Sequence, residues 1–203
     1  MSILNKTSSG DSPMHHMIKQ VMEDGIVLRQ QCQVLLQEPL LQAADLMQAC
    51  LKQNKKILVC GNGGSAADAQ HFVAELVNRF EKNRPALAAL ALTNDSSVLT
   101  SIANDFSFER VFSRQIEALG QSGDVLLAIS TSGTSANVLE AVKAAKHQHM
   151  TVILLTGGNK SSISPLCDVH IEIPHLSTAR VQEMHITCLH LLCTLIDEML
   201  FPC

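Results

Sequence analysis

Five short apolar runs, separated by stretches with helical character, constrain the fold of this chain more than any other feature. The runs are KILVC, LAALAL, DVLLAIS, TVILLTG and DVHIEIP, which begin at residues 56, 87, 124, 151 and 168. Most of them are apolar on both faces of a strand, which is typical of parallel strands covered by helices on both sides. We therefore predict an α/β fold, a three-layer αβα sandwich with a five-stranded parallel sheet.

Helices are predicted before and after this pattern. Residues 1 to about 12 are rich in Ser, Gly and Asp, so we expect a mobile N-terminus. From Pro13 to about Asn54 the apolar spacing predicts an N-terminal helical extension, either one long or two shorter amphipathic helices. The last helix, from about Thr178 to Leu200, is apolar almost all round after Ile186, which predicts burial at a subunit interface. Residues 13–203 then form a single domain.

The composition disfavours several classes of function. A net charge of −4, a pI near 6.1 and the absence of Trp and Tyr disfavour binding to nucleic acid. The seven cysteines are odd in number and form no CxxC motif, so we expect reduced thiols and a cytoplasmic protein. No run of about 18 apolar residues predicts a membrane span, and no signal-peptide pattern is present.

Two loops of small residues follow predicted strands, where ligands bind in open parallel sheets. The first is Gly61-Asn62-Gly63-Gly64-Ser65, and the second runs from Ile129 to Asn137 as ISTSGTSAN. Neither matches a P-loop or the G-x-G-x-x-G pattern. Turn and N-cap roles would explain either loop alone. Two such loops, with five hydroxyls from Ser130 to Ser135, favour binding of a phosphomonoester over a dinucleotide.

His71 and Glu75 lie four residues apart, on one face of the helix that begins at the first loop. A pair with this spacing can be a solvated helix contact. Because this helix starts at a predicted ligand site, the pair could also hold a divalent metal such as zinc, or Glu75 could act as a general base. A four-ligand metal site would need two further ligands from elsewhere.

The last helix carries a polar patch in RVQEMHITCLHLLCTLIDEML, made of Gln182, Glu183, His185 and His190. A histidine in such a helix is more often a core or interface residue whose nitrogens are bonded locally. Buried polar groups need partners, however, and four of them in nine residues favour a functional role.

Taken together, the motifs resemble the sugar isomerase (SIS) domain family and, within it, the phosphoheptose isomerases, which act on sedoheptulose 7-phosphate. The resemblance is carried by CGNGGSAADAQHFVAEL, NRP, IANDF, GDVLLAISTSGTSANV and RVQEMHITCLH, in this order from about residue 60 to 190. It implies the SIS fold and an aldose–ketose isomerase that makes a heptose precursor of lipopolysaccharide.

The resemblance also implies the site residues. Substrate contacts are expected at Asn62, Gly63, Gly64, Ser65, Glu75, Asn104, Asp105, Ser130, Thr131, Ser132, Ser135 and Gln182. The implied ligands of one Zn²⁺ per subunit are His71, Glu75, Gln182 and His190, in a homotetramer. We expect Glu75 to act as the base at carbon and His190 as the acid that protonates oxygen.

Two departures and two alternatives accompany this interpretation. The segment GGNKSSISP lacks an Asp-Gly-Gly that is common in the family, and Ala179 stands where some isomerases have Asp.

One alternative function is that of a non-catalytic SIS protein that binds the bacterial replication initiator or senses a sugar phosphate. Glu75 and His190 argue against it, because binding alone does not require them. The other alternative is isomerisation of a pentose or hexose phosphate in the same cradle.

Overall fold

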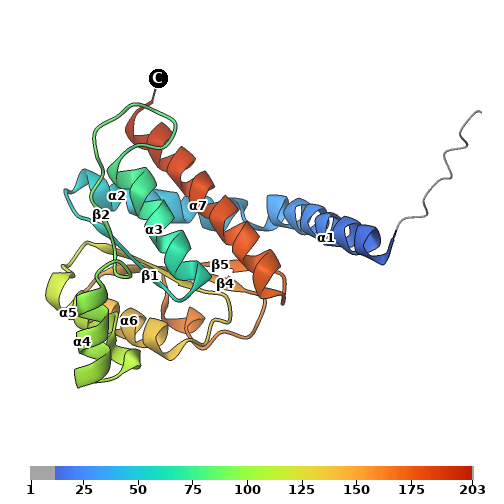
Figure 1. The fold of residues 1–203 in the computed structure, drawn as a ribbon. Coiled ribbons are helices and arrows are strands. Elements are labelled where there is room, and N and C mark those ends of the chain that lie inside the picture. The colour runs from blue at the N-terminus through green and yellow to red at the C-terminus, as the bar shows by residue number, and fades with distance from the viewer. Residues whose placement is uncertain (1–11, 203) are drawn as a thin grey trace, which may run out of the picture.

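A computed structural model describes residues 12–202 as a parallel sheet between two layers of helices (Figure 1). The strands are β1 (Ile57–Gly61), β2 (Ala89–Ala91), β3 (Val125–Ser130), β4 (Thr151–Gly157) and β5 (Val169–Ile173), in the order β2-β1-β3-β4-β5. All neighbouring strands pair in parallel. The predicted fold class and all five predicted strands are confirmed.

Helices cover both faces of the sheet, which explains why the three central strands, β1, β3 and β4, are buried on both faces. One layer contains α2 (Gln37–Lys52), α3 (Gly64–Val77) and α7 (Thr178–Leu200). The other contains α4 (Ser96–Asp105), α5 (Ser113–Leu119) and α6 (Ala136–His147), with short 3₁₀ turns at Phe108–Arg110 and Ser164–Leu166. Along β1, Ile57 and Val59 belong to the first core and Leu58 and Cys60 to the second.

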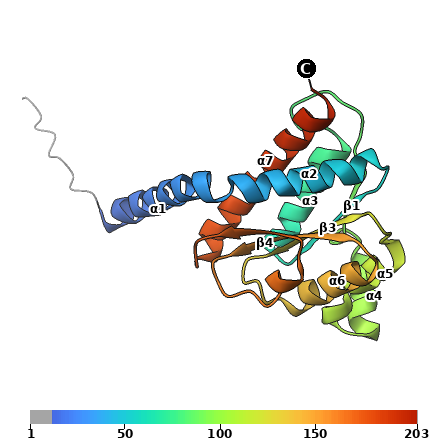
Figure 2. The same ribbon diagram turned by 180° about the vertical axis from the view of Figure 1, so that it is seen from behind.

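The N-terminal extension consists of two helices, of which α1 (Pro13–Leu35) projects from the body (Figures 1 and 2). The chain breaks at Leu36, which ends α1 and precedes α2. Pro39 explains the break, because its ring would clash with the carbonyl of Leu35 in a continuous helix. The predicted mobile N-terminus lies outside the described residues except for Ser12, whose Oγ accepts a hydrogen bond from the His15 N–H at the start of α1 (3.4 Å).

The last helix has the bounds expected from the sequence, but its polar residues do not form a single patch. His185 is fully buried and donates from Nε2 to the carbonyl oxygen of Thr156 on β4 (3.2 Å). Glu183 is exposed and pairs with Arg180. The structure confirms the core interpretation for His185, while Glu183 contacts a different neighbour on the surface.

Two expectations from composition can be compared with the described part of the chain. Six cysteines, all except Cys203, are described, and each is a free thiol. Among residues 12–202 there is no helix with both the length and the apolar character needed to cross a membrane.

His185 makes the stability of the fold depend on pH. Burial lowers the pKa of His185 to about 4, whereas an unfolded histidine titrates near roughly 6.5. As pH falls from about 6.5 to 4, only the unfolded chain takes up this proton, so the free energy of unfolding falls, by up to about 1.4 kcal/mol per pH unit. Chemical denaturation measured at several pH values in this range should show the free energy of unfolding falling as the pH falls.

The variant that tests this assignment is His185→Gln. Its side-chain amide can donate to the Thr156 carbonyl oxygen but does not titrate. It should flatten the dependence below pH 6.5, whereas His147→Gln, at an exposed position on α6, should leave it unchanged. Equal slopes in His185→Gln and the parent chain would refute the assignment.

Candidate active site

The first loop makes a tight turn from β1 into α3. A Cβ on Gly61 would lie within 3.0 Å of Ser65 and of the Ile129 carbonyl oxygen, so no larger residue fits without movement. Gly63 has φ of +56°, a backbone conformation that glycine adopts easily, and it precedes the first residue of α3. Ser65 is buried in the first turn of α3. The turn thus brings the N-terminus of α3 to the carboxyl edge of the sheet.

The second loop carries its hydroxyls at the same edge, after β3. Ser130 Oγ and Ser135 Oγ lie 3.0 Å apart. Ser132 Oγ accepts hydrogen bonds from the N–H and the hydroxyl of Thr134 (3.3 and 3.1 Å). The two loops are joined by a reciprocal pair of side-chain hydrogen bonds between Asn62 and Asn137, both 2.8 Å. The predicted proximity of the two loops is therefore confirmed.

The helix that starts at the second loop, α6, has free N–H groups at its N-terminus, whereas in α3 the N–H groups of Ser65, Ala66 and Ala67 donate to the carbonyl oxygens of Asn62 and Gly63. In α4 the carboxylate of Asp95 accepts from the N–H groups of Ser97 and Val98 (2.9 and 3.0 Å). Within the described residues, α3 and α6 have no such side-chain cap. The first hydrogen bond of α6 runs from Leu139 N–H to Ser135 O (3.0 Å), which leaves the earlier N–H groups available. Free N–H groups and the helix dipole both favour an anion. We call the two loops with these helix ends the anion cradle.

Further along α3, two histidines and a glutamate form a chain of contacts between α3 and α7. His71 Nε2 lies 3.1 Å from Glu75 Oε1 and 3.3 Å from His190 Nε2. The ring of Phe80 stacks on His190, with centroids 5.4 Å apart. His71 and Glu75 keep 46% and 25% of their side-chain surface exposed, so a ligand can reach them. The structure thus brings His190 to the pair predicted on α3, although the two histidines are 119 residues apart.

Hydrogen bonds satisfy this chain of contacts only in part. His71 Nε2 can donate to Glu75 Oε1 or accept from His190 Nε2, whose role depends on the tautomer, but it cannot do both at once. Donor atoms bound to one tetrahedral Zn²⁺ at roughly 2.0–2.1 Å lie about 3.3 Å apart, close to both observed separations. Over residues 12–202, however, no group of three or more His, Cys, Asp or Glu side chains is already arranged around a metal position. Zinc binding here stays a prediction from the family resemblance, in which His71 would be the central residue because its Nε2 contacts both Glu75 and His190.

Gln182, the fourth predicted zinc ligand, lies at the cradle. A Cβ on Gly64 would overlap the Gln182 side-chain amide, so α7 packs directly on the first loop at this point. Gln182 thus lies against the cradle, whereas His190, eight residues along the same helix, contacts His71.

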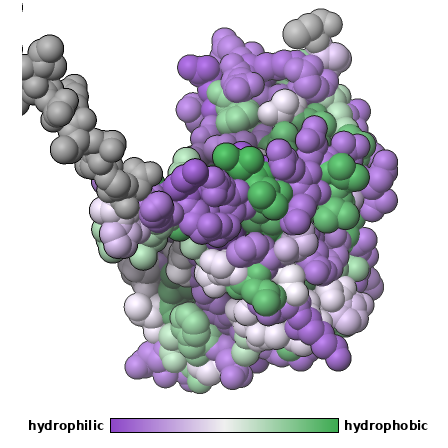
Figure 3. Space-filling model, turned by 90° about the vertical axis from the view of Figure 1, so that its right-hand side faces the viewer, coloured by the Kyte–Doolittle hydropathy of each residue, from purple (hydrophilic) through white to green (hydrophobic). Residues whose placement is uncertain are grey.

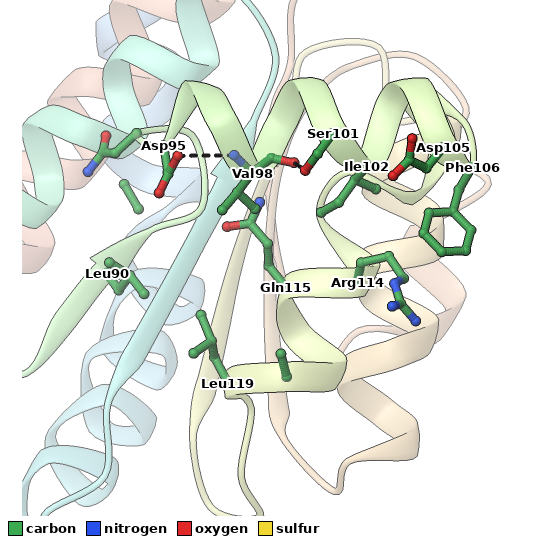
Figure 4. A pocket seen from close by; sticks show the side chains of 13 residues that line it. Leu90, Asp95, Val98, Ser101, Ile102, Asp105, Phe106, Arg114, Gln115 and Leu119 are labelled. Atoms are coloured by element: carbon green, nitrogen blue, oxygen red, sulfur yellow. Dashed lines mark hydrogen bonds between the residues drawn. The ribbon is translucent and has the colours of Figure 1, made fainter.

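Asn104 and Asp105 lie at the end of α4, away from Asp95 at its start. Both are exposed, and Asn104 Nδ2 donates to Asp105 Oδ1 (2.9 Å). Asp105 lines a separate pocket of about 530 Å³ between α4, α5 and the edge strand β2 (Figure 4). The Arg114 guanidinium lies over the Phe106 ring there, 4.7 Å from its centroid. These two substrate contacts remain predictions from the family resemblance.

Arg84 and Asp197 are the buried residues that the sequence interpretation missed. Arg84 Nε donates to Asp197 Oδ1 (2.7 Å), and the two side chains are 1% and 3% exposed. The guanidinium also donates to the carbonyl oxygens of Glu75 and Leu76, at 2.8 Å each. Arg84 therefore fastens the last turn of α3, next to Glu75, to α7. Asp197 lies in the apolar part of the last helix, and a charged residue there could have indicated a buried basic partner.

Comparison with known proteins places the sequence and the fold in a family. The chain belongs to the SIS domain family, whose model matches residues 22–157. Within the family it is similar to the phosphoheptose isomerases. The protein of that name from Neisseria gonorrhoeae is 54% identical over 180 residues, which are 87% of this chain and 91% of the relative.

Two solved structures extend the likeness to three dimensions. Phosphoheptose isomerase GmhA from Neisseria gonorrhoeae superposes with a TM-score of 0.87 at 49% identity, over 91% of this chain and 99% of the other. A phosphoheptose isomerase from Francisella tularensis gives a TM-score of 0.89 at 38% identity, over 92% of this chain and 100% of the other.

Proposed function

We propose that this chain is a sugar-phosphate isomerase that converts D-sedoheptulose 7-phosphate to D-glycero-D-manno-heptose 7-phosphate, a heptose precursor of lipopolysaccharide. One observation carries the proposal: α3 begins in the anion cradle and bears His71 and Glu75 further along, in a chain 54% identical to a phosphoheptose isomerase. The cradle fits the phosphate, and the side chains further along α3 fit the reacting end of the sugar.

The phosphate would be bound by hydroxyls and by N–H groups. Ser65, Ser130, Thr131, Ser132 and Ser135 supply the hydroxyls. Because the Ser130 and Ser135 hydroxyls share one hydrogen bond, in which either can be the donor, both can turn towards phosphate oxygens without leaving another protein group unpaired. The uncapped end of α6 adds free N–H donors, and the dipoles of α3 and α6 both favour an anion.

Isomerisation moves one proton between carbons and one between oxygens. Glu75 would take a proton from C1 of the open-chain ketose, giving an enediolate, and return it to C2. His190 would open the sugar ring and carry the second proton between O1 and O2. Arg84 fixes the backbone at Glu75 and Phe80 stacks on the His190 ring, which supports a defined position for both groups.

We also propose one Zn²⁺ per subunit, held by His71, Glu75, Gln182 and His190. Three of these residues are linked through His71 Nε2 at distances that suit shared ligation, whereas Gln182 lies about two turns earlier on α7, against Gly64, and would have to turn towards the ion. When bound, the ion would polarise the sugar carbonyl or order the side chains around it.

A homotetramer is proposed from the family resemblance, and the apolar surface of α1 supports association of subunits. Of its residues only Leu28 and Cys32 are buried, and the exposed large apolar ones are Met14, Met17, Ile18, Val21, Met22, Ile26, Val27, Val34 and Leu35. Leu191 of α7 is also exposed, beside Leu40 and Leu41 of α2. Figure 3 shows hydrophobic residues gathered on the side from which α1 projects. Covering such a surface is a usual cause of oligomerisation.

The cysteines support our proposal of a cytoplasmic enzyme. Burial raises the pKa of the Cys60, Cys188 and Cys193 thiols to about 12. Buried thiols of this kind are unreactive, and free thiols are typical of a reducing compartment.

The acid/base assignment predicts two inactive variants. Glu75→Gln and His190→Gln should each lower kcat for sedoheptulose 7-phosphate about a hundred- to ten-thousandfold, because each removes one proton-transfer group. A coupled assay of the aldose product measures this loss, and calorimetry with inorganic phosphate tests whether the cradle still binds.

The matched controls are Glu81→Gln and His147→Gln at exposed positions, both expected to be as active as the parent. A folded Glu75→Gln variant with normal turnover would remove Glu75 from the mechanism. A parent chain that binds phosphate without turning over any sugar phosphate would favour the non-catalytic alternative.

The zinc proposal predicts the metal content of the protein. Protein purified without chelator should contain about one zinc per chain by elemental analysis, and His71→Ala should contain much less, because His71 contacts two of the other ligands. Full activity in a metal-free preparation would leave these side chains with the acid/base role alone.

The homotetramer proposal predicts the mass of the protein in solution. Light scattering should give four times the chain mass of 22.0 kDa. Ile18→Glu places a charge on the exposed surface of α1 and should lower that mass, whereas Leu119→Glu on α5 should not. A monomer at micromolar concentration would contradict the proposal.

A further inference from the structure

The loop between β4 and β5 packs on the second loop of the anion cradle. This segment, residues 158–164, contains the run that departs from the family pattern, GNKSSIS. We propose that it supports the phosphate-binding loop from behind, and that Ser161 is a positioning residue that keeps the carbonyl groups of that loop turned away from the substrate phosphate. The inference rests on the proposed phosphate site and adds a residue that does not touch the substrate.

Ser161 makes the central contacts. Its Oγ donates to the carbonyl oxygen of Gly133 at 2.9 Å, and the N–H of Ser162 donates to the same oxygen at 3.1 Å. The Ser161 Oγ also accepts from the N–H groups of Ile163 and Ser164, at 3.1 and 3.0 Å. Because these two donors fix the orientation of the hydroxyl, its proton is directed at Gly133.

Gly133 is held in a conformation that depends on this contact. Its φ is +67°, and a Cβ at this position would overlap the Ser161 side chain. Its N–H donates to the carbonyl oxygen of Ser130 (3.0 Å), which closes the turn. The two segments therefore touch with no room for a side chain on Gly133, so the position of Ser161 determines how this turn lies.

A second carbonyl of the loop is held in the same way. Thr131 O accepts from the N–H of Gly157, the last residue of β4, at 3.0 Å. In a planar trans peptide the C=O and the following N–H point in opposite directions. With the Thr131 and Gly133 carbonyls bonded behind the loop, the next N–H groups, of Ser132 and Thr134, point towards its other side, where the Thr134 N–H meets Ser132 Oγ in the free chain (3.3 Å).

The direction of these carbonyl and N–H groups determines whether the loop attracts an anion. A carbonyl oxygen that turned towards a phosphate would repel it, whereas N–H groups and hydroxyls on that side attract it. When the Ser161 hydroxyl is lost, Gly133 O keeps only the donors from Ser162 and the turn gains freedom. Loss of this hydroxyl should therefore weaken phosphate binding but leave the rate of proton transfer unchanged, because Glu75 and His190 lie on α3 and α7.

The test compares Ser161→Ala with Ser161→Thr, which keeps the hydroxyl, and with Ser122→Ala in an exposed turn. Calorimetry measures the Kd of inorganic phosphate, and the coupled assay gives KM and kcat. Loss of one such hydrogen bond should raise both Kd and KM about five- to tenfold in Ser161→Ala, with kcat within about twofold of the parent. Ser161→Thr and Ser122→Ala should match the parent.

Each other outcome overturns the inference. Unchanged Kd and KM in Ser161→Ala, or a loss of kcat alone, would show that Ser161 does not position the loop. If Ser161→Ala does not fold, Ser161→Cys keeps a weaker donor of similar size, and a Kd equal to that of the parent would refute the proposal. Absence of phosphate binding by the parent chain would overturn the proposed cradle itself, and the inference with it.

Discussion

The geometry of the site depends on one buried ion pair, between Arg84 and Asp197. Arg84 donates to the carbonyls at the end of α3 and to a carboxylate on α7, so a single guanidinium joins the two helices that carry Glu75 and His190. The second oxygen of this carboxylate, Asp197 Oδ2, is buried and has no hydrogen-bond partner among the described residues. Removing either charge from such a pair leaves the other buried and unpaired, which typically costs about 3–5 kcal/mol. Few surface changes would disturb the two helices as much.

The sheet supplies the rest of the arrangement. Because all five strands are parallel, the loops after β1 and β3 open at the same edge, and the Asn62–Asn137 pair holds them together. The loop after β4 then reaches the second loop from behind through Ser161. Binding and proton transfer therefore use different parts of α3, and each part has its own support: Ser161 for the cradle and Arg84 for the acid/base groups.

The sequence predicts the fold well, because the apolar strands and the period of the last helix are local patterns. It also indicates both loops and the His71–Glu75 pair, whose members are close along the chain. What it could not predict are contacts made only by packing. His185 and His190 share one helix, yet His185 bonds to β4 and His190 to His71. Arg84 meets Asp197 across 113 residues, and no spacing rule reports such a pair.

The two ends of the proposed substrate are held by one rigid element. Ten residues separate Ser65 from Glu75 on α3, so their backbones differ by about 15 Å along the helix axis. When the phosphate is bound in the cradle, the distance from the cradle to Glu75 is fixed. In a shorter sugar phosphate the carbonyl carbon would therefore lie too far from the base. Selection among sugar phosphates would then follow from helix length, independently of contacts to individual hydroxyl groups.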